Sequence, residues 1–171
     1  MPRAAKGARR KHPSTVRLLL LTGVPGAGKT TLGDDLRDEH GFRHLDFETN
    51  TRVNFLGDGS ERHVRTRVNR LKKDGRDVVI SWGFVPDQQL GFPLLFRKLG
   101  FTWVWLDGNR EASHRAFTNR GTGSETNYTV QMEKIVRVID PQLDALAPVV
   151  INPFDDAGEF LTCDEIGGKL P

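Results

Sequence analysis

Short apolar runs alternate along the chain with longer segments in which apolar residues recur every three or four positions. The runs are typical of strands buried on both faces, and the spacing is typical of helices with one buried face. Val64, Val68 and Leu71, for example, share one face of a predicted helix that Ser60 can cap and Gly75 can end. The predicted strands are residues 16–22, 42–47, 78–82, 101–106 and 149–151. The predicted helices are residues 29–39, 60–74, 86–99, 110–119 and 128–147, the last with a bend at Pro141.

This alternation of strand and helix predicts right-handed βαβ units and therefore a parallel sheet with helices on both faces. We expect an α/β fold of three layers, α/β/α, around a five-stranded parallel sheet. The sequence has no internal repeat, and residues 14–171 are predicted to form a single domain. In such sheets ligands bind beyond the carboxyl ends of the strands. The residues that follow each strand are therefore the candidates for function.

A glycine-rich motif, G-x-x-x-x-G-K-[ST], follows the first predicted strand. Its residues are Gly23, Val24, Pro25, Gly26, Ala27, Gly28, Lys29 and Thr30, and Thr31 comes next. Glycines let the backbone curl so that successive N–H groups point at phosphate oxygens, and the following helix adds its positive N-terminal end. The lysine would neutralise the β- and γ-phosphates, and the threonine hydroxyl would bind Mg²⁺. The motif thus predicts a nucleoside triphosphate site.

Two carboxylates, Asp46 and Glu48, lie at the end of the second predicted strand, where alternation places both on one side. An acid at this edge can hold Mg²⁺ through water or accept the proton of an attacking hydroxyl. Arg52, in the same loop, could clamp an anionic substrate group or pair with Glu48. Gly83, after the third strand, allows a substrate to approach the backbone closely. We predict that these residues bind the substrate.

The third strand lacks the aspartate with which nucleotide hydrolases usually support Mg²⁺, since Ser81 or Trp82 takes that place. This argues against a motor-type ATPase. Trp82 and Phe84 could line a substrate pocket, although core packing is the more common fate of such aromatic residues.

Two arginines, Arg115 and Arg120, lie in or next to the helix after the fourth strand, just before a polar stretch, residues 121–127. Arginines beside such a stretch suit a lid that closes over the γ-phosphate, excludes water and neutralises developing charge. We therefore predict a short lid around residues 120–127.

The net charge of +3 is unevenly distributed over the 171 residues. Residues 1–12 hold five Lys/Arg and no acid, which leaves 20 basic and 22 acidic residues in the remainder. We interpret residues 1–13 as a flexible basic tail and do not expect nucleic acid as a partner. No apolar run approaches the roughly 20 residues of a membrane span. The single cysteine, Cys163, excludes a disulfide framework within the chain and fits the reducing cytoplasm.

In the order of these parts the chain resembles the small P-loop kinases of metabolites, such as shikimate kinase, gluconate kinase and the chloramphenicol phosphotransferases. The resemblance covers roughly residues 16–151 and rests on the phosphate loop, on Asp46-x-Glu48 where shikimate kinases have D-x-D, and on the strand that ends in Gly83. It implies a P-loop NTPase fold, ATP and Mg²⁺ as cofactors, and an alcohol group as phosphate acceptor. It also implies roles for further residues: Arg115 against the adenine, Arg120 as the lid arginine, and Asn152 and Pro153 in the adenine-side loop.

The chain departs from shikimate kinases in Glu48, in a glycine run reduced to Gly83, and in the missing R-P-L-L after Arg120. These departures argue against shikimate itself. We expect transfer of the γ-phosphate of ATP·Mg²⁺ to a hydroxyl of a metabolite or antibiotic. A nucleoside or nucleotide kinase stays open because of Arg52 and Arg62. Two further alternatives are a GTPase-like regulator, which would lack its guanine-reading N-K-x-D, and an RNA-end kinase that uses the basic tail.

Overall fold

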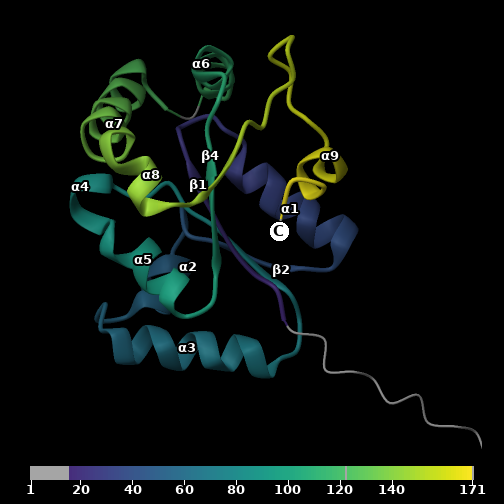
Figure 1. Ribbon diagram of the computed structural model, residues 1–171, viewed down its shortest axis with the longest axis vertical. Coiled ribbons are helices and arrows are strands. Elements are labelled where there is room, and N and C mark those ends of the chain that lie inside the picture. Colours follow the sequence, from purple (N-terminus) through teal and green to yellow (C-terminus); the bar gives the residue numbers. More distant parts are fainter. Residues whose placement is uncertain (1–15, 122, 171) are drawn as a thin grey trace, which may run out of the picture.

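The computed structural model describes residues 16–121 and 123–170, so the predicted tail, residues 1–13, lies outside the described residues. Its centre is one sheet whose five strands are all parallel and follow the order β2-β3-β1-β4-β5 (Figure 1). The strands are β1 (Leu18–Gly23), β2 (Arg43–Asp46), β3 (Val78–Ser81), β4 (Thr102–Leu106) and β5 (Val149–Ile151). The predicted α/β fold with a five-stranded parallel sheet is confirmed.

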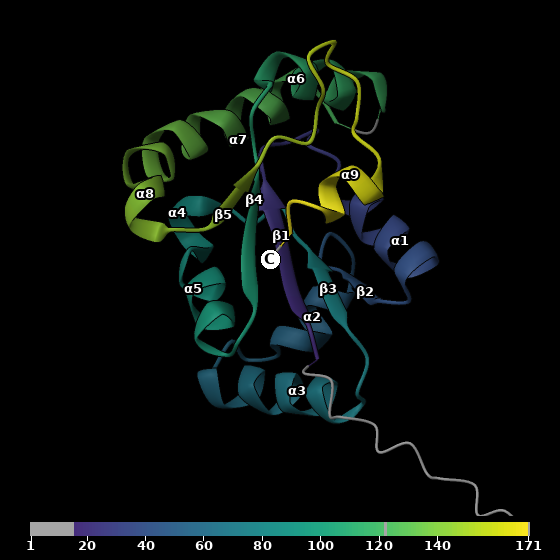
Figure 2. The ribbon, with the colours of Figure 1, turned by 45° about the vertical axis from the view of Figure 1, so that its right-hand side comes forward.

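Helices cover both faces of this sheet. They are α1 (Lys29–His40), α2 (Thr51–Leu56), α3 (Glu61–Lys73), α4 (Pro86–Gln89), α5 (Gly91–Lys98), α6 (Arg110–Asn119), α7 (Glu125–Val138), α8 (Leu143–Leu146) and α9 (Cys163–Gly167), with the 3₁₀ turn η1 (Asp140–Gln142). Helices α1 and α9 lie on one side of the sheet, and α4, α5 and α7 lie on the other (Figure 2). None of the helices in the described ranges is both long enough and apolar enough to cross a membrane.

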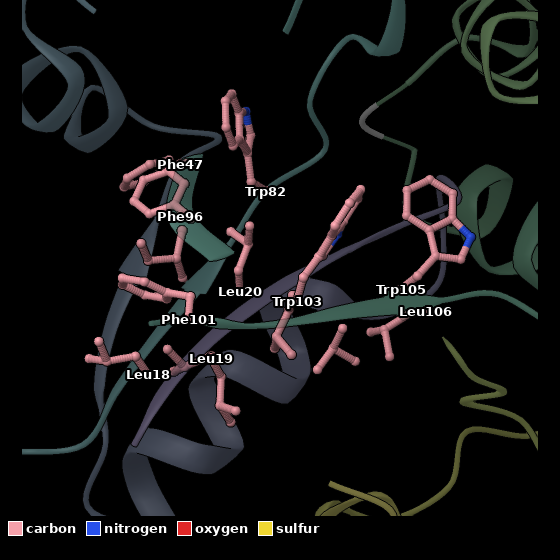
Figure 3. Close-up of a cluster of buried hydrophobic side chains, with 14 of the residues drawn as sticks. Leu18, Leu19, Leu20, Phe47, Trp82, Phe96, Phe101, Trp103, Trp105 and Leu106 are labelled. Atoms are coloured by element: carbon pink, nitrogen blue, oxygen red, sulfur yellow. The ribbon is translucent and has the colours of Figure 1, made fainter. Parts of the chain in front are cut away.

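The central strand β1 is buried along its whole length, which explains the continuous hydrophobic run in its sequence. Aromatic rings from several elements fill the space beside it (Figure 3). The Trp82 side chain is fully buried, and its ring centroid lies 5.6 Å from that of Phe47 and 5.8 Å from that of Phe84. Trp82 and Phe84 therefore belong to the core, which was one of the two fates expected for them.

Two predicted helices differ from the observed ones for local reasons. The predicted helix 86–99 is divided into α4 and α5. Pro93 has no N–H to donate to the carbonyl of Gln89, four residues earlier, so it suits only the first turn of a new helix. The predicted helix 128–147 starts earlier, at Glu125, because the Ser124 hydroxyl accepts a hydrogen bond from the Asn127 N–H and caps it. It ends at Val138, before the 3₁₀ turn that contains Pro141.

Two short helices, α2 and α9, were not predicted. Helix α2 has only six residues and is too short for its periodicity to be recognised. Helix α9 has a signal that could have been read: the Thr162 hydroxyl accepts from the Glu165 N–H, and the Glu165 carboxylate accepts from the Thr162 N–H. This is a capping box, recognisable as Thr followed three residues later by Glu.

Candidate functional site

The phosphate loop runs from the end of β1 to the start of α1, and its shape depends on glycine. The backbone of Gly26 has φ +79°, and a Cβ at this position would lie 1.9 Å from the carbonyl oxygen of Ser113 in α6. Gly28 has φ +75° and occupies the N-cap position of α1. The Val24 N–H donates to the Leu106 carbonyl at 3.1 Å and joins the loop to β4. The loop is therefore held by neighbouring backbone, and its glycines allow a close approach that a Cβ would prevent.

The ammonium group of Lys29 lies within this loop. Its Nζ donates to the carbonyl oxygen of Val24 at 3.0 Å and to that of Gly23 at 3.4 Å. Burial lowers the pKa of Lys29 to about 8, Glu48 opposes this shift, and the positive charge of Arg120 adds to it. A partly buried cation with a lowered pKa is stabilised by a polyanion, so Lys29 is suited to bind phosphate.

The two carboxylates predicted after β2 are both held by backbone N–H groups. One oxygen of Asp46, Oδ1, accepts from the Glu48 N–H at 2.9 Å. The Oε1 atom of Glu48 accepts from the Gly83 N–H at 2.6 Å. A Cβ on Gly83 would lie 2.5 Å from Glu48 Oε1 and 3.7 Å from Lys29 Cε, so this glycine leaves the gap between the two side chains open.

A chain of side-chain hydrogen bonds connects Asp46, through Ser81 and His44, to α1. The sequence did not predict this chain. His44 Nδ1 lies 3.0 Å from Asp34 Oδ1 of α1, and His44 Nε2 lies 2.8 Å from Ser81 Oγ. Ser81 Oγ in turn lies 3.4 Å from Asp46 Oδ1. A carboxylate can only accept, so the hydrogen belongs on Nδ1, and a neutral imidazole then accepts at Nε2 from the Ser81 hydroxyl. The serine hydrogen can point either to His44 or to Asp46, which couples the two side chains.

One cleft of about 680 Å³ brings most of the predicted residues together. It is lined by Pro25, Gly26, Lys29 and Thr30 from the phosphate loop and the start of α1, by Asp46 at the end of β2 and Glu48 just beyond it, and by Gly83, Val85 and Pro86 after β3. Its remaining walls are Phe117, Arg120 and Gly123 at the α6–α7 connection and Asn127, Val130, Gln131 and Lys134 from α7. The α7 residues were not predicted, because their approach to the phosphate loop depends on how α7 packs.

Apart from the phosphate loop and the Thr31 that follows it, four predicted residues lie outside this cleft: Arg52, Arg115, Asn152 and Pro153. Within that segment, Gly23, Val24, Ala27, Gly28 and Thr31 do not line the cleft either. Arg115 is exposed, pairs with Glu111 at 3.6 Å, and lies beside Gly158 in the segment that follows β5. The Asn152 side chain accepts from the Phe154 N–H at 3.1 Å and the Asn109 N–H at 3.4 Å. Arg115 is thus a neighbour of the segment after β5. Arg52 lines neither the cleft nor, among the described contacts, this segment.

A divalent cation requires oxygen ligands, and the cleft offers two of the predicted kind. The hydroxyl of Thr30 and the carboxylate of Asp46 both line it, and hard oxygen donors suit Mg²⁺. A second group of ligand atoms, from Glu39, His40 and Cys163, lies within 4.8 Å of one another at the far end of α1. It contains a thiol, which is a poor ligand for Mg²⁺, so it is not a substitute for the site in the cleft.

Comparison with known proteins places the fold. No model of a known protein family matches the sequence, and no curated protein sequence matches it. Among solved structures, the chain is similar to a shikimate kinase from Acinetobacter baumannii in complex with shikimate, with 21% identity, a TM-score of 0.54, and 84% of this chain and 87% of that chain covered. It is also similar to a gluconokinase from Sinorhizobium meliloti 1021, with 14% identity, a TM-score of 0.53, and 91% and 89% covered. The predicted resemblance to small P-loop metabolite kinases is therefore confirmed at the level of the fold.

Proposed function

We propose that the chain is an ATP-dependent phosphotransferase that moves the γ-phosphate of ATP·Mg²⁺ to a hydroxyl group of a small molecule. The observation that carries this proposal is the single cleft that holds Lys29 together with Asp46 and Glu48. A phosphate loop alone supports only nucleotide binding. Carboxylates in the same cleft add a proton acceptor, which transfer to a hydroxyl requires.

The phosphate loop supplies three kinds of positive charge to the triphosphate. Its backbone N–H groups and the N-terminal end of α1 would contact phosphate oxygens, and Lys29 would neutralise part of their charge. Arg120 lines the same cleft and would stabilise the charge on the transferred group. Thr30 would bind Mg²⁺ directly and Asp46 would hold it through water, and the bound ion would neutralise phosphate charge.

Asp46 is the best placed residue to accept the proton of the acceptor hydroxyl. Its Oδ1 is held by the Glu48 N–H, while Oδ2 has no hydrogen-bond partner among the residues that the structure describes. As Asp46 takes the proton, the hydroxyl oxygen forms a bond to the γ-phosphorus. The bond from that phosphorus to the β–γ bridging oxygen breaks, and ADP leaves. Glu48, fixed on Gly83, would orient the acceptor through its own hydrogen bonds.

The adenine end of ATP would lie outside the cleft, beside Arg115 and the segment after β5. Arg115 neighbours Gly158 of that segment, and Asn152 shapes its start. We therefore retain Arg115, Asn152 and Pro153 as proposed adenine contacts. Arg52 does not line the cleft, so its proposed contact with an anionic acceptor requires an acceptor that extends from the cleft to Arg52.

The test is a screen for ADP release over hydroxylated metabolites, nucleosides and antibiotics, with Lys29→Ala protein as the blank. We expect at least one acceptor to raise ADP release above that of protein with ATP·Mg²⁺ alone, and mass spectrometry should find the phosphorylated product. Lys98→Ala, which removes an exposed lysine, is the matched control and should keep full activity. Acceptor-independent hydrolysis in every case would contradict a phosphotransferase.

Asp46→Asn separates catalysis from binding. The amide keeps the size of the side chain but cannot take a proton, so we expect kcat to fall by roughly 10²-fold or more with little change in the affinity for ATP. A near-normal kcat would show that Asp46 is not the proton acceptor.

A further inference from the structure

Helix α3 carries a second concentration of positive charge, besides residues 1–12. Its sequence, ERHVRTRVNRLKK, holds six Lys/Arg and one acid, Glu61. The apolar residues Val64, Val68 and Leu71 are all buried. The basic side chains therefore occupy the remaining arc of the helix, which faces away from the core.

Two adjoining hollows lie along this arc. One, of about 530 Å³, is formed with α2 and β2 and includes Arg43, Arg67, Arg70 and Lys73. The other, of about 390 Å³, lies at the start of α3 and includes Arg62 together with the same Arg67 and Arg70. These five residues are called the α3 basic surface below.

The only acids in the two hollows are already engaged. Asp74 pairs with Arg43 at 3.0 Å, and the Asp58 carboxylate accepts from the Ser60 N–H at 3.0 Å. Within the described ranges, Arg67 and Arg70 have no carboxylate at ion-pair distance. Two adjacent arginines without an acidic partner repel each other, so a bound anion would relieve that repulsion.

The spacing of the cations suits a row of anions. Arg67, Arg70 and Lys73 are three residues apart, so they recur along roughly 9 Å of the helix axis. A nucleic acid strand presents a phosphate about every 3.4 Å along its axis, and this row can therefore meet two or three phosphates. The apolar residues of α3 are buried, so the helix lacks the exposed apolar face by which an amphipathic helix enters a lipid surface.

The α3 basic surface is separate from the phosphate loop. In Figures 1 and 2, α3 lies at the opposite end of the molecule from α6 and α7, which border the cleft. Arg17 lies near the C-terminal end of α3, because it pairs with Asp77, four residues after the end of that helix, at 2.7 Å.

We propose that the α3 basic surface binds the sugar-phosphate backbone of a nucleic acid duplex. Guanidinium groups pair with phosphate oxygens in two-point contacts, and such contacts fix position without reading sequence. The hollows contain no exposed aromatic residue on which a base could stack, which favours backbone contacts over base recognition. This inference does not depend on the proposed phosphotransferase activity.

The test measures binding of the full chain to fluorescein-labelled 20-base-pair duplexes of RNA and of DNA by fluorescence anisotropy, from 50 to 200 mM KCl. We expect the logarithm of the binding constant to fall linearly with the logarithm of the salt concentration, with a slope of about −3 or steeper. The two duplexes distinguish RNA from DNA as the source of the phosphates.

Charge reversal locates the surface. Arg67→Glu/Arg70→Glu should weaken binding at least tenfold and make the slope shallower by about 2, because two phosphate contacts are lost. Arg137→Glu/Lys169→Glu makes the same change in net charge elsewhere on exposed side chains and should bind as the wild type does. Circular dichroism should show both double variants folded. Lys29→Ala should bind the duplexes normally, which separates this result from the fate of the proposed activity.

Three outcomes would overturn the proposal. Absence of binding at 50 mM KCl would exclude a duplex site. Equal weakening in the two double variants would show that only overall charge matters. A stronger affinity for phosphatidylserine vesicles than for either duplex, or binding that needs residues 1–12 but ignores Arg67→Glu/Arg70→Glu, would assign the interaction to another partner or another part of the chain.

Discussion

The imidazole of His44 lies 2.8 Å from the hydroxyl oxygen of Ser81, one strand away in the sheet. His44 comes from β2 and Ser81 from β3, and the register that pairs Asp46 with Ser81 brings the hydroxyl near both side chains. The His44 ring is almost completely buried, with 3% of its side chain exposed. Packing therefore fixes the position of the His44 ring, and the ring can hold the Ser81 hydroxyl next to Asp46.

This relationship predicts coupled effects on catalysis. His44→Phe and Ser81→Ala each break the chain of hydrogen bonds that leads to Asp46. One such bond is worth about 1 kcal/mol, so each substitution should lower kcat by roughly fivefold if the chain orients Asp46. The double variant should lose about as much as either single variant, because the two residues act through one path. Steady-state ADP release with a productive acceptor measures this. Losses that multiply would show that the two residues act independently.

The lowered pKa of Lys29 predicts that ATP binding depends on pH. With a pKa of about 8 in the free protein, Lys29 is charged below pH 8 and loses its proton as the pH rises above that value. Bound phosphates favour the charged form and raise the pKa, so binding above pH 8 requires uptake of a proton. The affinity should therefore fall by roughly tenfold between pH 7 and pH 9.

Titration with a fluorescent ATP analogue at the two pH values would measure the change in affinity. Lys29→Arg is the control, since a guanidinium group stays charged throughout this range. Its affinity, though lower, should change little with pH. A wild-type affinity that is as insensitive to pH as that of Lys29→Arg would contradict the assignment.

The contact between Gly26 and α6 predicts a stability difference between two glycines. Gly26→Ala would place a methyl group against the Ser113 carbonyl and require a left-handed backbone, so it should lower the free energy of unfolding by about 1–3 kcal/mol. Gly91 begins α5, and a Cβ there would meet nothing within 4 Å. Gly91→Ala should be neutral or stabilising by about 0.5–1 kcal/mol. Urea unfolding followed by circular dichroism compares the two, and equal destabilisation would refute the steric explanation.

An ion pair at the start of α6 predicts a structural role for Arg110. Its Nη2 lies 2.6 Å from Asp107 Oδ2 and 2.8 Å from Asp140 Oδ1, and these hydrogen bonds raise the pKa of Arg110, Asp140 contributing first. Arg110→Met would leave the buried Asp107 without its ion-pair partner and, among the described residues, with hydrogen bonds only from the Gly108 N–H and Trp105 Nε1. Because Arg110 is partly exposed, we expect a loss of only about 1–3 kcal/mol in the free energy of unfolding.

Arg137→Met is the comparison for Arg110. Arg137 is 69% exposed and lies 3.4 Å from Asp87. A surface pair of this kind is worth about 0–1 kcal/mol, so the melting temperature should hardly change. If both substitutions lowered the melting temperature equally, the burial of Asp107 would not be the cause of the Arg110 effect.

The phosphate loop was predictable because its chemistry is contiguous. Eight adjacent residues carry the glycines, the lysine and the threonine, and the strand before them and the helix after them can be recognised from their own residues. Strands β1, β3 and β4 were likewise predictable, since a strand buried on both faces requires an apolar run. The parallel direction of the five strands followed from the helices between them.

The other side of the cleft was predictable only in part. Asp46, Glu48 and Gly83 follow strands, and strand ends meet at one edge of the sheet. Arg52 is only four residues beyond Glu48 but does not line the cleft. It belongs to helix α2, which begins at Thr51 and is not part of the cleft wall. Lys134 and Gln131 line the cleft although no motif marks them.

The sequence by itself determined the strand–helix alternation and a loop able to bind phosphate, because both depend on neighbours along the chain. Only the tertiary structure decided which side chains meet across the cleft and which hydrogen bonds hold Asp46. It also decided that the basic residues of α3 gather with Arg43 of β2 around one hollow. These arrangements depend on strand register and helix packing, which bring together residues that no local pattern connects.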